Sequence, residues 1–300
     1  MAGESGSFMT RFSPASSTRY QAPKGADRFP RSETSCIGCF VPRYDFSAQR
    51  LFVEERLAPG HRFQLNQTQA NYLLSVLRMR EGDQLLVFNG RDGEWLTELT
   101  NTSKRSADLA MLQRTRVQER GPDIDYCFAP LKHARLDYMV QKAVEMGARR
   151  LVPVLTKRTQ VSRINLSRMH ANAIEAAEQC GILAVPEIVP ETSLSAYLAE
   201  RAPERLLIFC DEEADVGNPV TALQHARRQH DPPVFALLIG PEGGFDPSER
   251  AALIAAPNVL PISLGPRILR ADTAAVAGLA LLQAVLGDWN TEQPRTTMSP

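Results

Sequence analysis

Two consecutive apolar runs constrain the fold of this chain most, because each ends in a Gly/Pro-rich turn and is followed by a helical pattern. The first is VFALLIGPEGGFDPSER, residues 234–250, and the second is LPISLGPRILRADTAAVAGLALLQ, residues 260–283. Strand, tight loop and helix in succession are typical of α/β proteins, which place ligand sites at the carboxyl ends of their strands. We therefore predict a ligand site formed by the two loops.

The first loop, GPEGGF at residues 240–245, has glycines that let the backbone approach a ligand closely. The Lys-Ser/Thr pair of a phosphate loop and the G-x-G-x-x-G pattern of a dinucleotide site are both absent, which excludes those two motifs. Asp246 and Glu249 fit a helix N-cap and its capping box, so we interpret them as structural. Glu242 has no capping duty. It is either a turn carboxylate paired with a backbone amide or an arginine, or a functional group.

The second loop, LGPRILR at residues 264–270, places apolar residues between Arg267 and Arg270. Exposed Ile and Leu side chains need cover from a neighbouring loop or from an apolar ligand surface such as a purine ring. The two arginines could hold RNA phosphate or a carboxylate. Asp272 is interpreted as the cap of a helix over residues 273–286, the alternative being a role in proton removal.

That final helix is apolar almost all round, with Thr273 and Gln283 as its polar residues. Such a helix is typical of a deeply buried element or of one half of a subunit interface. We favour a homodimer.

The remaining pattern predicts two domains between two irregular ends. Five or six short strands and one helix after residue 49 indicate a small β-barrel. Asn66 and Gln69 are expected to cap its helix, in which Tyr72, Leu73, Val76 and Leu77 share a face. Beyond residue 121, alternating strands and helices predict an α/β domain whose mostly parallel sheet has helices on both faces. The predicted boundaries are 1–48 for a disordered extension, 49–120 for the barrel, 121–290 for the α/β domain and 291–300 for a flexible tail.

Charge is balanced over the chain but uneven along it. Lys+Arg and Asp+Glu number 34 each, so net charge does not indicate an anionic partner. Residues 131–170 carry nine bases and two acids, whereas residues 171–217 carry two bases and ten acids. This asymmetry is compatible with a surface that faces RNA phosphate, and equally with solvated helix faces.

Nothing in the sequence indicates a membrane span, a disulfide framework or a metal site. No apolar stretch approaches the roughly 18 residues of a membrane span. The five cysteines suggest no disulfide framework in a chain of this length, which fits a reducing cytoplasm. Cys36 and Cys39 form a lone C-x-x-C without a second pair or nearby histidines, so we expect no metal site.

The two loop segments together resemble a known enzyme family. LLIGPEGGFDPSER and ISLGPRILRADTAAVAGLALLQ are similar to the signature segments of the RsmE family, SPOUT-class enzymes that methylate N3 of a uridine in 16S ribosomal RNA with S-adenosylmethionine. Both segments in this order and at this spacing are highly specific. The likeness continues through LKHARLDYMVQKAVEMGARRLVPVLTKRTQ and includes RLFVEE and LRMREGDQLLVFNG, which resemble the family's PUA-like RNA-binding module. It covers about residues 50–288.

This resemblance implies a fold, partners and site residues. The fold would be a trefoil-knotted, mostly parallel α/β sheet preceded by a PUA-like barrel. The protein would be a cytoplasmic homodimer that acts on 16S ribosomal RNA within the assembled small subunit, with no metal and no membrane. The residues implied to hold S-adenosylmethionine are Leu238, Gly240, Pro241, Glu242, Gly243, Gly244, Leu264, Gly265, Pro266, Ile268, Leu269 and Arg270. The basic residues expected to contact RNA are Arg78, Arg80, Lys132, Lys142, Arg158 and Arg267.

Methylation of N3 requires alignment of two reacting centres and loss of the N3 proton. Glu242 or Asp272 could accept this proton, or Arg270 could stabilise the uracil anion through its carbonyl oxygens. The sequence leaves these alternatives open, and it does not identify the uridine. Rival functions are a knotted methyltransferase that acts on transfer RNA or on a ribose hydroxyl, and a non-catalytic RNA-binding assembly factor.

Two positions depart from the family pattern. Asp272 stands where the family commonly has Glu, which shortens the reach of the carboxylate by one methylene. Cys180 and Gly181 stand where the family often has Ser and Arg. An RNA contact from that arginine would therefore be missing here or supplied by another residue.

Overall fold

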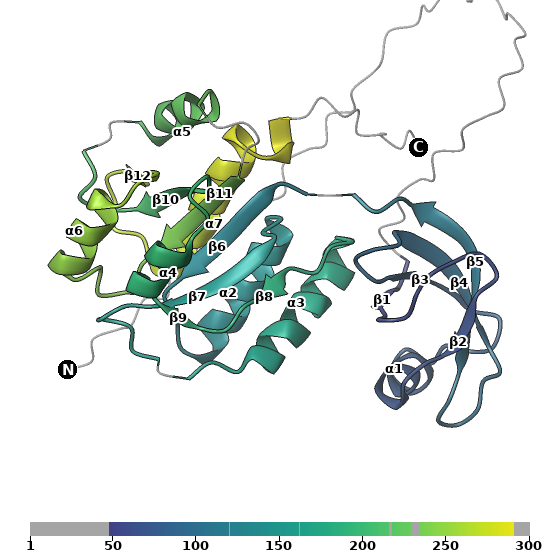
Figure 1. The fold of residues 1–300 in the computed structure, drawn as a ribbon. Coiled ribbons are helices and arrows are strands. Elements are labelled where there is room, and N and C mark those ends of the chain that lie inside the picture. Colours follow the sequence, from purple (N-terminus) through teal and green to yellow (C-terminus); the bar gives the residue numbers. More distant parts are fainter. Residues whose placement is uncertain (1–47, 120, 162, 216–217, 230–233, 291–300) are drawn as a thin grey trace, which may run out of the picture. The chain divides into compact units, whose positions relative to one another are not determined.

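A computed structural model of the chain describes residues 48–119, 121–161, 163–215, 218–229 and 234–290 (Figure 1). The expectations for the two ends, residues 1–48 and 291–300, therefore fall outside the described residues apart from Ala48. The Cys36 and Cys39 pair also falls outside them.

The front of the chain forms a five-stranded sheet over one hydrophobic core. Its strand order is β1-β3-β4-β5-β2, antiparallel except for the parallel pair of β1 and β3. Alternate residues such as Leu85, Val87, Leu99 and Leu109 point into the core, as expected for strands with one buried face. The strands are β1 (Arg50–Phe52), β2 (Arg62–Gln64), β3 (Gln84–Phe88), β4 (Glu94–Thr100) and β5 (Asp108–Arg116).

A tight hairpin turn joins β3 to β4. Asn89 accepts hydrogen bonds through Oδ1 from the backbone N–H groups of Arg91 and Asp92, at 3.0 and 2.8 Å. Gly93 has φ +85°, and a Cβ there would lie 2.2 Å from the carbonyl oxygen of Arg116. Both the left-handed backbone and the close approach of β5 therefore require glycine at this position.

The short helix of this domain begins as predicted and then changes type. Asn66 and Gln69 form the expected capping box at the start of α1 (Gln67–Asn71). A π-helical turn, η1 (Tyr72–Val76), follows without a break. Because a π-turn is wider than an α-turn, the expected spacing of side chains shifts. Leu73 is buried and Tyr72 and Leu77 pack against the same core, but Val76 is 63% exposed, so the predicted shared face is wrong for Val76.

The second sheet has seven strands, every one paired in parallel. Its order is β12-β10-β11-β6-β7-β8, with β9 also on β7. The predicted parallel sheet is confirmed. β8 and β9, of two residues each, were not predicted. The bounds are β6 (Asp123–Phe128), β7 (Arg150–Leu155), β8 (Glu187–Ile188), β9 (Thr192–Ser193), β10 (Leu206–Cys210), β11 (Val234–Ile239) and β12 (Val259–Ile262).

Helices cover both faces of this sheet, as predicted (Figure 1). Ile124, Tyr126 and Phe128 of β6 point to the face covered by α2, α3, α5 and α7, whereas Cys127 points to the face covered by α4 and α6. The bounds are α2 (His133–Glu145), α3 (Leu166–Cys180), α4 (Leu194–Glu200), α5 (Pro219–Arg227), α6 (Pro247–Ala255), α7 (Ala271–Val285) and a final 3-10 turn, η2 (Asp288–Asn290).

The last helix packs tightly against the middle of the sheet. A Cβ at Gly278 of α7 would lie 2.9 Å from Cδ2 of Leu237 in β11, so only glycine allows this approach. Gln283, 1% exposed, donates from Nε2 to the carbonyl oxygen of Met146 and so ties α7 to the end of α2. The apolar helix is thus buried on one side. The trefoil knot stays a prediction.

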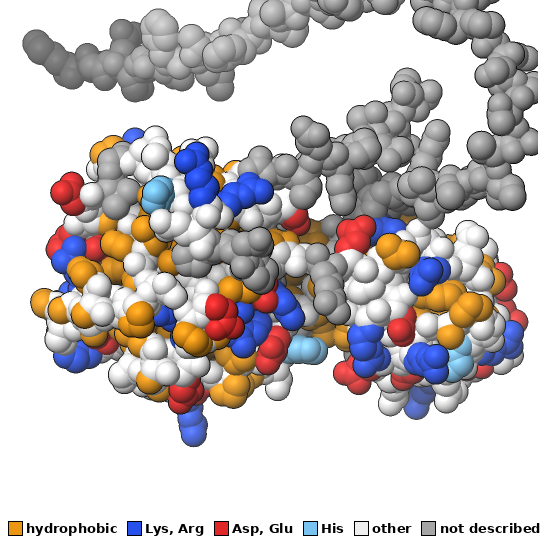
Figure 2. Space-filling view, turned by 45° about the horizontal axis from the view of Figure 1, so that its top comes forward, with side chains coloured by type: hydrophobic (Ala, Val, Ile, Leu, Met, Phe, Trp, Pro, Cys, Tyr) orange, Lys and Arg blue, Asp and Glu red, His pale blue; other side chains and the backbone are white. Residues whose placement is uncertain are grey.

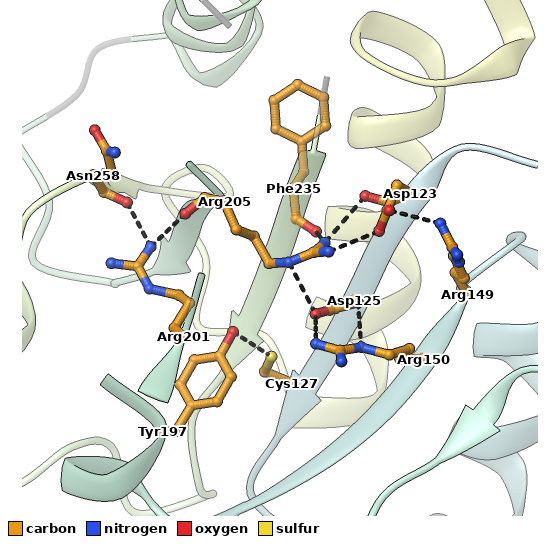
Figure 3. A network of polar contacts seen from close by, with 10 residues as sticks. All are labelled: Asp123, Asp125, Cys127, Arg149, Arg150, Tyr197, Arg201, Arg205, Phe235 and Asn258. Atoms are coloured by element: carbon orange, nitrogen blue, oxygen red, sulfur yellow. Dashed lines mark hydrogen bonds and ion pairs between the residues drawn. The ribbon is translucent and has the colours of Figure 1, made fainter. Parts of the chain in front are cut away.

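Ion pairs cluster along the edge of the sheet that is formed by the amino-terminal ends of its parallel strands (Figure 3). The fully buried carboxylate of Asp125 accepts two hydrogen bonds from Arg150, at 2.9 and 2.5 Å, and lies 3.2 Å from Nε of Arg205. Arg205 also bonds Asp123 at 2.9 Å and the carbonyl oxygen of Phe235 at 2.8 Å. A buried carboxylate needs such pairing to remain charged. This edge is therefore structural, and the loops of interest lie at the opposite, carboxyl-terminal ends of β11 and β12.

Candidate functional site

The first loop is a tight turn closed by its own aromatic residue. The backbone N–H of Gly244 donates to the carbonyl oxygen of Pro241 at 2.9 Å, with Gly244 at φ +68°. Phe245 then folds back, and a Cβ at Gly240 would lie 2.5 Å from its ring. The ring packs edge-on against Phe209 of β10, with centroids 5.1 Å apart. Packing of Phe245 thus accounts for the glycine that opens the loop.

The segment after β7 clips onto this loop and onto α6. Lys157 donates from its backbone N to Glu249 at 2.8 Å, and from Nζ to Asp246 at 3.1 Å and to Ser248 Oγ at 2.6 Å. The predicted capping box of Asp246 and Glu249 is confirmed. Hydrogen bonds from Ser248 and Lys157 lower the pKa of Asp246 to about 2. Arg158 reaches the carbonyl oxygen of Gly243 through Nη1 at 2.7 Å. Two basic residues therefore stabilise the turn.

The second loop exposes its apolar side chains, as the sequence predicts. Ile268 is 88% exposed, and Leu264 and Leu269 are half-buried. Gly265 has φ +107° and no heavy atom within 4 Å of a hypothetical Cβ, so its backbone stands open. Arg267 and Arg270 are exposed. Within the described residues, no carboxylate lies at ion-pair distance from either guanidinium.

One arginine that the sequence did not single out joins the two loops. Arg135, in the first turn of α2, forms an ion pair through Nη1 with Glu242 of the first loop. It also donates from Nε to Oδ2 of Asp272, just after the second loop, at 3.1 Å. Arg135 entered the sequence analysis only as one base of the run 131–170. The available signal was its place one turn into the helix after β6, the strand beside β11.

This contact settles the structural surroundings of the two candidate carboxylates. Glu242 pairs with an arginine, which is one of the partners expected for a turn carboxylate, and its functional role stays a prediction. The prediction that Asp272 caps the final helix is wrong. Arg270 is the N-cap residue of α7, without a side-chain cap bond, and Asp272 lies inside the first turn. The bond from Arg135, supported by the N–H of Thr273, lowers the pKa of Asp272 below its ordinary value.

A shallow pocket opens beside the first loop. It is a depression open to solvent, with a cavity volume of only about 20 Å³. Its apolar lining includes Leu131, Val161 and Pro241, and its polar lining comes from Lys132, Arg158, Gln160 and Glu242. The structure thus brings Lys132 and Arg158, two of the six residues expected to contact RNA, together with the Glu242 carboxylate.

The other residues expected to contact RNA lie in different settings. Lys142 donates to Glu145 at 2.7 Å and sits 5.5 Å from the ring centroid of Tyr138, and this pair raises the pKa of Lys142. Arg78, with φ +59°, and Arg80 are exposed on the front domain after the π-turn. On the face shown in Figure 2, the basic side chains of the described residues lie among acidic and apolar ones rather than in one continuous stripe.

The described part of the chain contains neither a metal site nor a helix that could span a membrane. Within it, no group of three His, Cys, Asp or Glu side chains is placed to hold a metal ion. Its helices are also too short or too polar to cross a membrane.

Comparison with known proteins shows to which family these two domains belong. Residues 118–283 match the model of an RNA methyltransferase domain, and residues 65–112 match that of an RNA methyltransferase PUA domain. A relative named ribosomal RNA small subunit methyltransferase E from Synechocystis sp. is 30% identical over 74% of this chain and 73% of its own length. The chain belongs to the RsmE family of RNA methyltransferases. The relative of that name from Rickettsia conorii is 28% identical over 77% of this chain and 93% of its own.

A solved RsmE structure shares the fold. The small subunit methyltransferase E from Neisseria gonorrhoeae, bound to S-adenosylmethionine, is 26% identical, with a TM-score of 0.70 over 81% of this chain and all of its own. RsmE membership confirms the resemblance read from the two loop segments. It also confirms the fold class, a PUA-like domain followed by an α/β methyltransferase domain. The predicted domain boundaries stay predictions.

The departure from the RsmE pattern at Gly181 has a structural role. Gly181 ends α3 in the left-handed conformation, with φ +64°. Its carbonyl oxygen accepts a hydrogen bond from Nη1 of Arg116 in β5 at 2.8 Å. One turn earlier, Glu178 accepts from the backbone N–H of Phe52 in β1 at 2.8 Å. The end of α3 thus holds the front sheet in place, where the family often has an arginine.

Proposed function

We propose that this protein transfers a methyl group from S-adenosylmethionine to N3 of a uridine in 16S ribosomal RNA. The observation that carries the proposal lies in the RNA methyltransferase domain, where β11 and β12 flank β10 and each ends in a Gly/Pro-rich loop. The guanidinium of Arg135 pairs with Glu242 of the first loop and with Asp272 just after the second. A relative of the same fold binds S-adenosylmethionine. Loops at the carboxyl ends of parallel strands are where such folds bind ligands.

The residues of the two loops fit this cofactor. Ile268, Leu264 and Leu269 offer the apolar surface that an adenine ring requires. At Gly265, where an added Cβ would meet no heavy atom within 4 Å, the backbone allows close approach of the cofactor. The cofactor supplies a methyl group on a positively charged sulfur. We assign its binding to the twelve loop residues from Leu238 to Gly244 and from Leu264 to Arg270 that the family pattern implies.

We assign the target base to the pocket lined by Lys132, Arg158 and Glu242. The two bases suit flanking RNA phosphates, and the apolar wall suits the face of a pyrimidine. Glu242 is the proposed proton acceptor, because it lines the pocket and its side chain is 46% exposed. Asp272 does not line the pocket. The N3 proton would pass to Glu242 as the methyl group leaves the sulfur of the bound cofactor and bonds to N3, and Arg270 would stabilise the uracil oxygens.

The proposed partners follow from the same family. The substrate is the RNA of the assembled small subunit, and the exposed Arg78 and Arg80 of the front domain contact its backbone. The enzyme acts in the cytoplasm as a homodimer. The dimer is supported by α7, where Val276, Ala277, Ala280 and Leu281 are only half-buried within one chain.

The deciding experiment is incubation of undermethylated small subunits with labelled S-adenosylmethionine, followed by nuclease digestion and identification of the labelled nucleoside. We expect 3-methyluridine from one position of 16S RNA. Label in transfer RNA or on a ribose hydroxyl would replace this function with that of another knotted methyltransferase. Failure of the protein to bind the cofactor in calorimetry would instead indicate a non-catalytic assembly factor.

A further inference from the structure

The guanidinium of Arg135 is placed between two carboxylates that are 30 residues apart in the sequence. Its Nη1 pairs with Glu242, and its Nε donates to Asp272 at 3.1 Å. Its side chain is 34% exposed, against 46% for Glu242 and 21% for Asp272. The cluster of Arg135, Glu242 and Asp272 is therefore partly buried.

The alternative to this arrangement is unfavourable. Two carboxylates drawn toward one point repel each other unless a cation lies between them. Arginine suits the position because its planar fork carries donors that point in different directions, whereas the ammonium of lysine is a single point charge. One guanidinium therefore keeps both carboxylates, and the segments that carry them, in the same place.

The third nitrogen of Arg135 adds an independent observation. Nη2 is buried and has no hydrogen-bond acceptor among the described residues. Buried donors are almost always satisfied in folded proteins. An acceptor from a ligand that enters between the loops would complete the set.

We propose that Arg135 is a positioning residue that couples the two loops, so that each loop reaches its working conformation only with the other. Its part in methyl transfer rests on the function proposed above, but the coupling itself is a property of the free protein. Arg135 touches neither reacting atom in this account. It acts through Glu242 and Asp272, and it makes α2 a third wall of the site.

Amide hydrogen exchange of the free protein tests the coupling directly. In Arg135→Gln, we expect the exchange rate to rise at least fivefold in the peptides that cover residues 240–245 and also in those that cover residues 266–274. Arg149→Gln is the matched control, since Arg149 pairs with Asp123 at the opposite edge of the sheet and is 64% exposed. This control should leave both loops at the wild-type rate. Arg135→Lys should fall between, because one ammonium cannot serve both carboxylates.

A second variant keeps the test decisive if Arg135→Gln does not fold. Asp272→Asn releases Arg135 from the second loop, and we expect faster exchange in the first loop, which residue 272 itself does not touch. Wild-type exchange at residues 240–245 in Asp272→Asn, or loosening of only one loop in Arg135→Gln, would overturn the coupling.

The functional consequence is a split between cofactor and RNA. In Arg135→Gln, the Kd for S-adenosylmethionine should rise about tenfold and kcat should fall, while KM for the small subunit stays unchanged, because Lys132 and Arg158 are untouched. A raised KM with wild-type kcat and cofactor affinity would contradict the positioning role. Absence of uridine methylation by the wild-type enzyme would remove the proposed function, whereas the exchange experiment would still decide whether Arg135 couples the loops.

Discussion

At the scale of single residues, the two candidate proton acceptors differ in their position relative to the pocket. Both carboxylates contact Arg135, yet only Glu242 also lines the pocket beside Lys132 and Arg158. Asp272 is held inside the first turn of α7, where Arg135 keeps its carboxylate ionised. Its position thus accounts for the tolerated change from Glu, since a shorter side chain still reaches Arg135.

A pair of isosteric substitutions separates these roles. Glu242→Gln should lower the single-turnover rate of methyl transfer by about 10² to 10⁴, the usual loss for a general base. Asp272→Asn should lower it less and should mainly weaken cofactor binding. Rapid-quench measurement at saturating cofactor gives both rates. Equal losses in the two variants, or a larger loss in Asp272→Asn, would assign proton removal to Asp272.

The capping carboxylate Asp246 has a pH signature. Its pKa falls from 3.8 in the unfolded chain to about 2 in the folded protein. The stabilisation is therefore complete above pH 4 and is lost as the pH falls toward 2. Asp246→Asn should lower Tm clearly at pH 6, and the difference from wild type should shrink by pH 3. A difference in Tm that is constant from pH 6 to pH 3 would show that the charge of Asp246 contributes nothing.

At the scale of elements, regular periodicity was predictable and local irregularity was not. The bounds of α3, α4 and β10 follow from the apolar spacing and from Gly181 as a stop signal. The π-turn after α1 was missed, because an extra residue per turn leaves no mark on a five-residue pattern. The start of α7 was placed two residues late, because Asp272 looks like a cap in sequence but serves Arg135 in the fold.

The β3–β4 hairpin offers a test of how closely two strands approach. Gly93→Ala should cost about 2 to 4 kcal/mol, since the new methyl meets the backbone of Arg116 and the left-handed φ is itself unfavourable. Gly82→Ala is the control, with φ +90° but no atom within 4 Å of the added Cβ. It should cost about 1 to 2 kcal/mol. Urea unfolding measures both, and equal costs would rule out the close approach of Arg116.

At the scale of the whole molecule, the two-part fold and both loops could be predicted from the sequence, because contiguous motifs encode them. It could not give Arg135, whose partners lie 107 and 137 residues further along the chain. Periodicity reports which face of a helix is buried, but not which distant carboxylate the first turn will meet. Strand order is likewise a long-range property, and the resemblance, rather than the pattern, supplied the expected topology.

The proposed dimer is testable through α7. Ala284 is exposed within one chain, so Ala284→Glu should fold normally but would bury a charge at a subunit interface. Light scattering after gel filtration should show a dimer for wild type and a monomer for this variant. Ala251→Glu, at an exposed position of α6, should remain dimeric. A dimeric Ala284→Glu protein would place the interface elsewhere.

The contact between Gln283 and the end of α2 has a consequence for the order of synthesis. Residues 135 and 146 leave the ribosome well before residues 272 and 283, to which they are bonded in the finished fold. Domains generally fold from the N-terminus during translation, so the front sheet can form early, while the α/β domain must wait for its last helix. A nascent chain therefore has its front module before it has a site, and it gains the site only when translation is nearly complete.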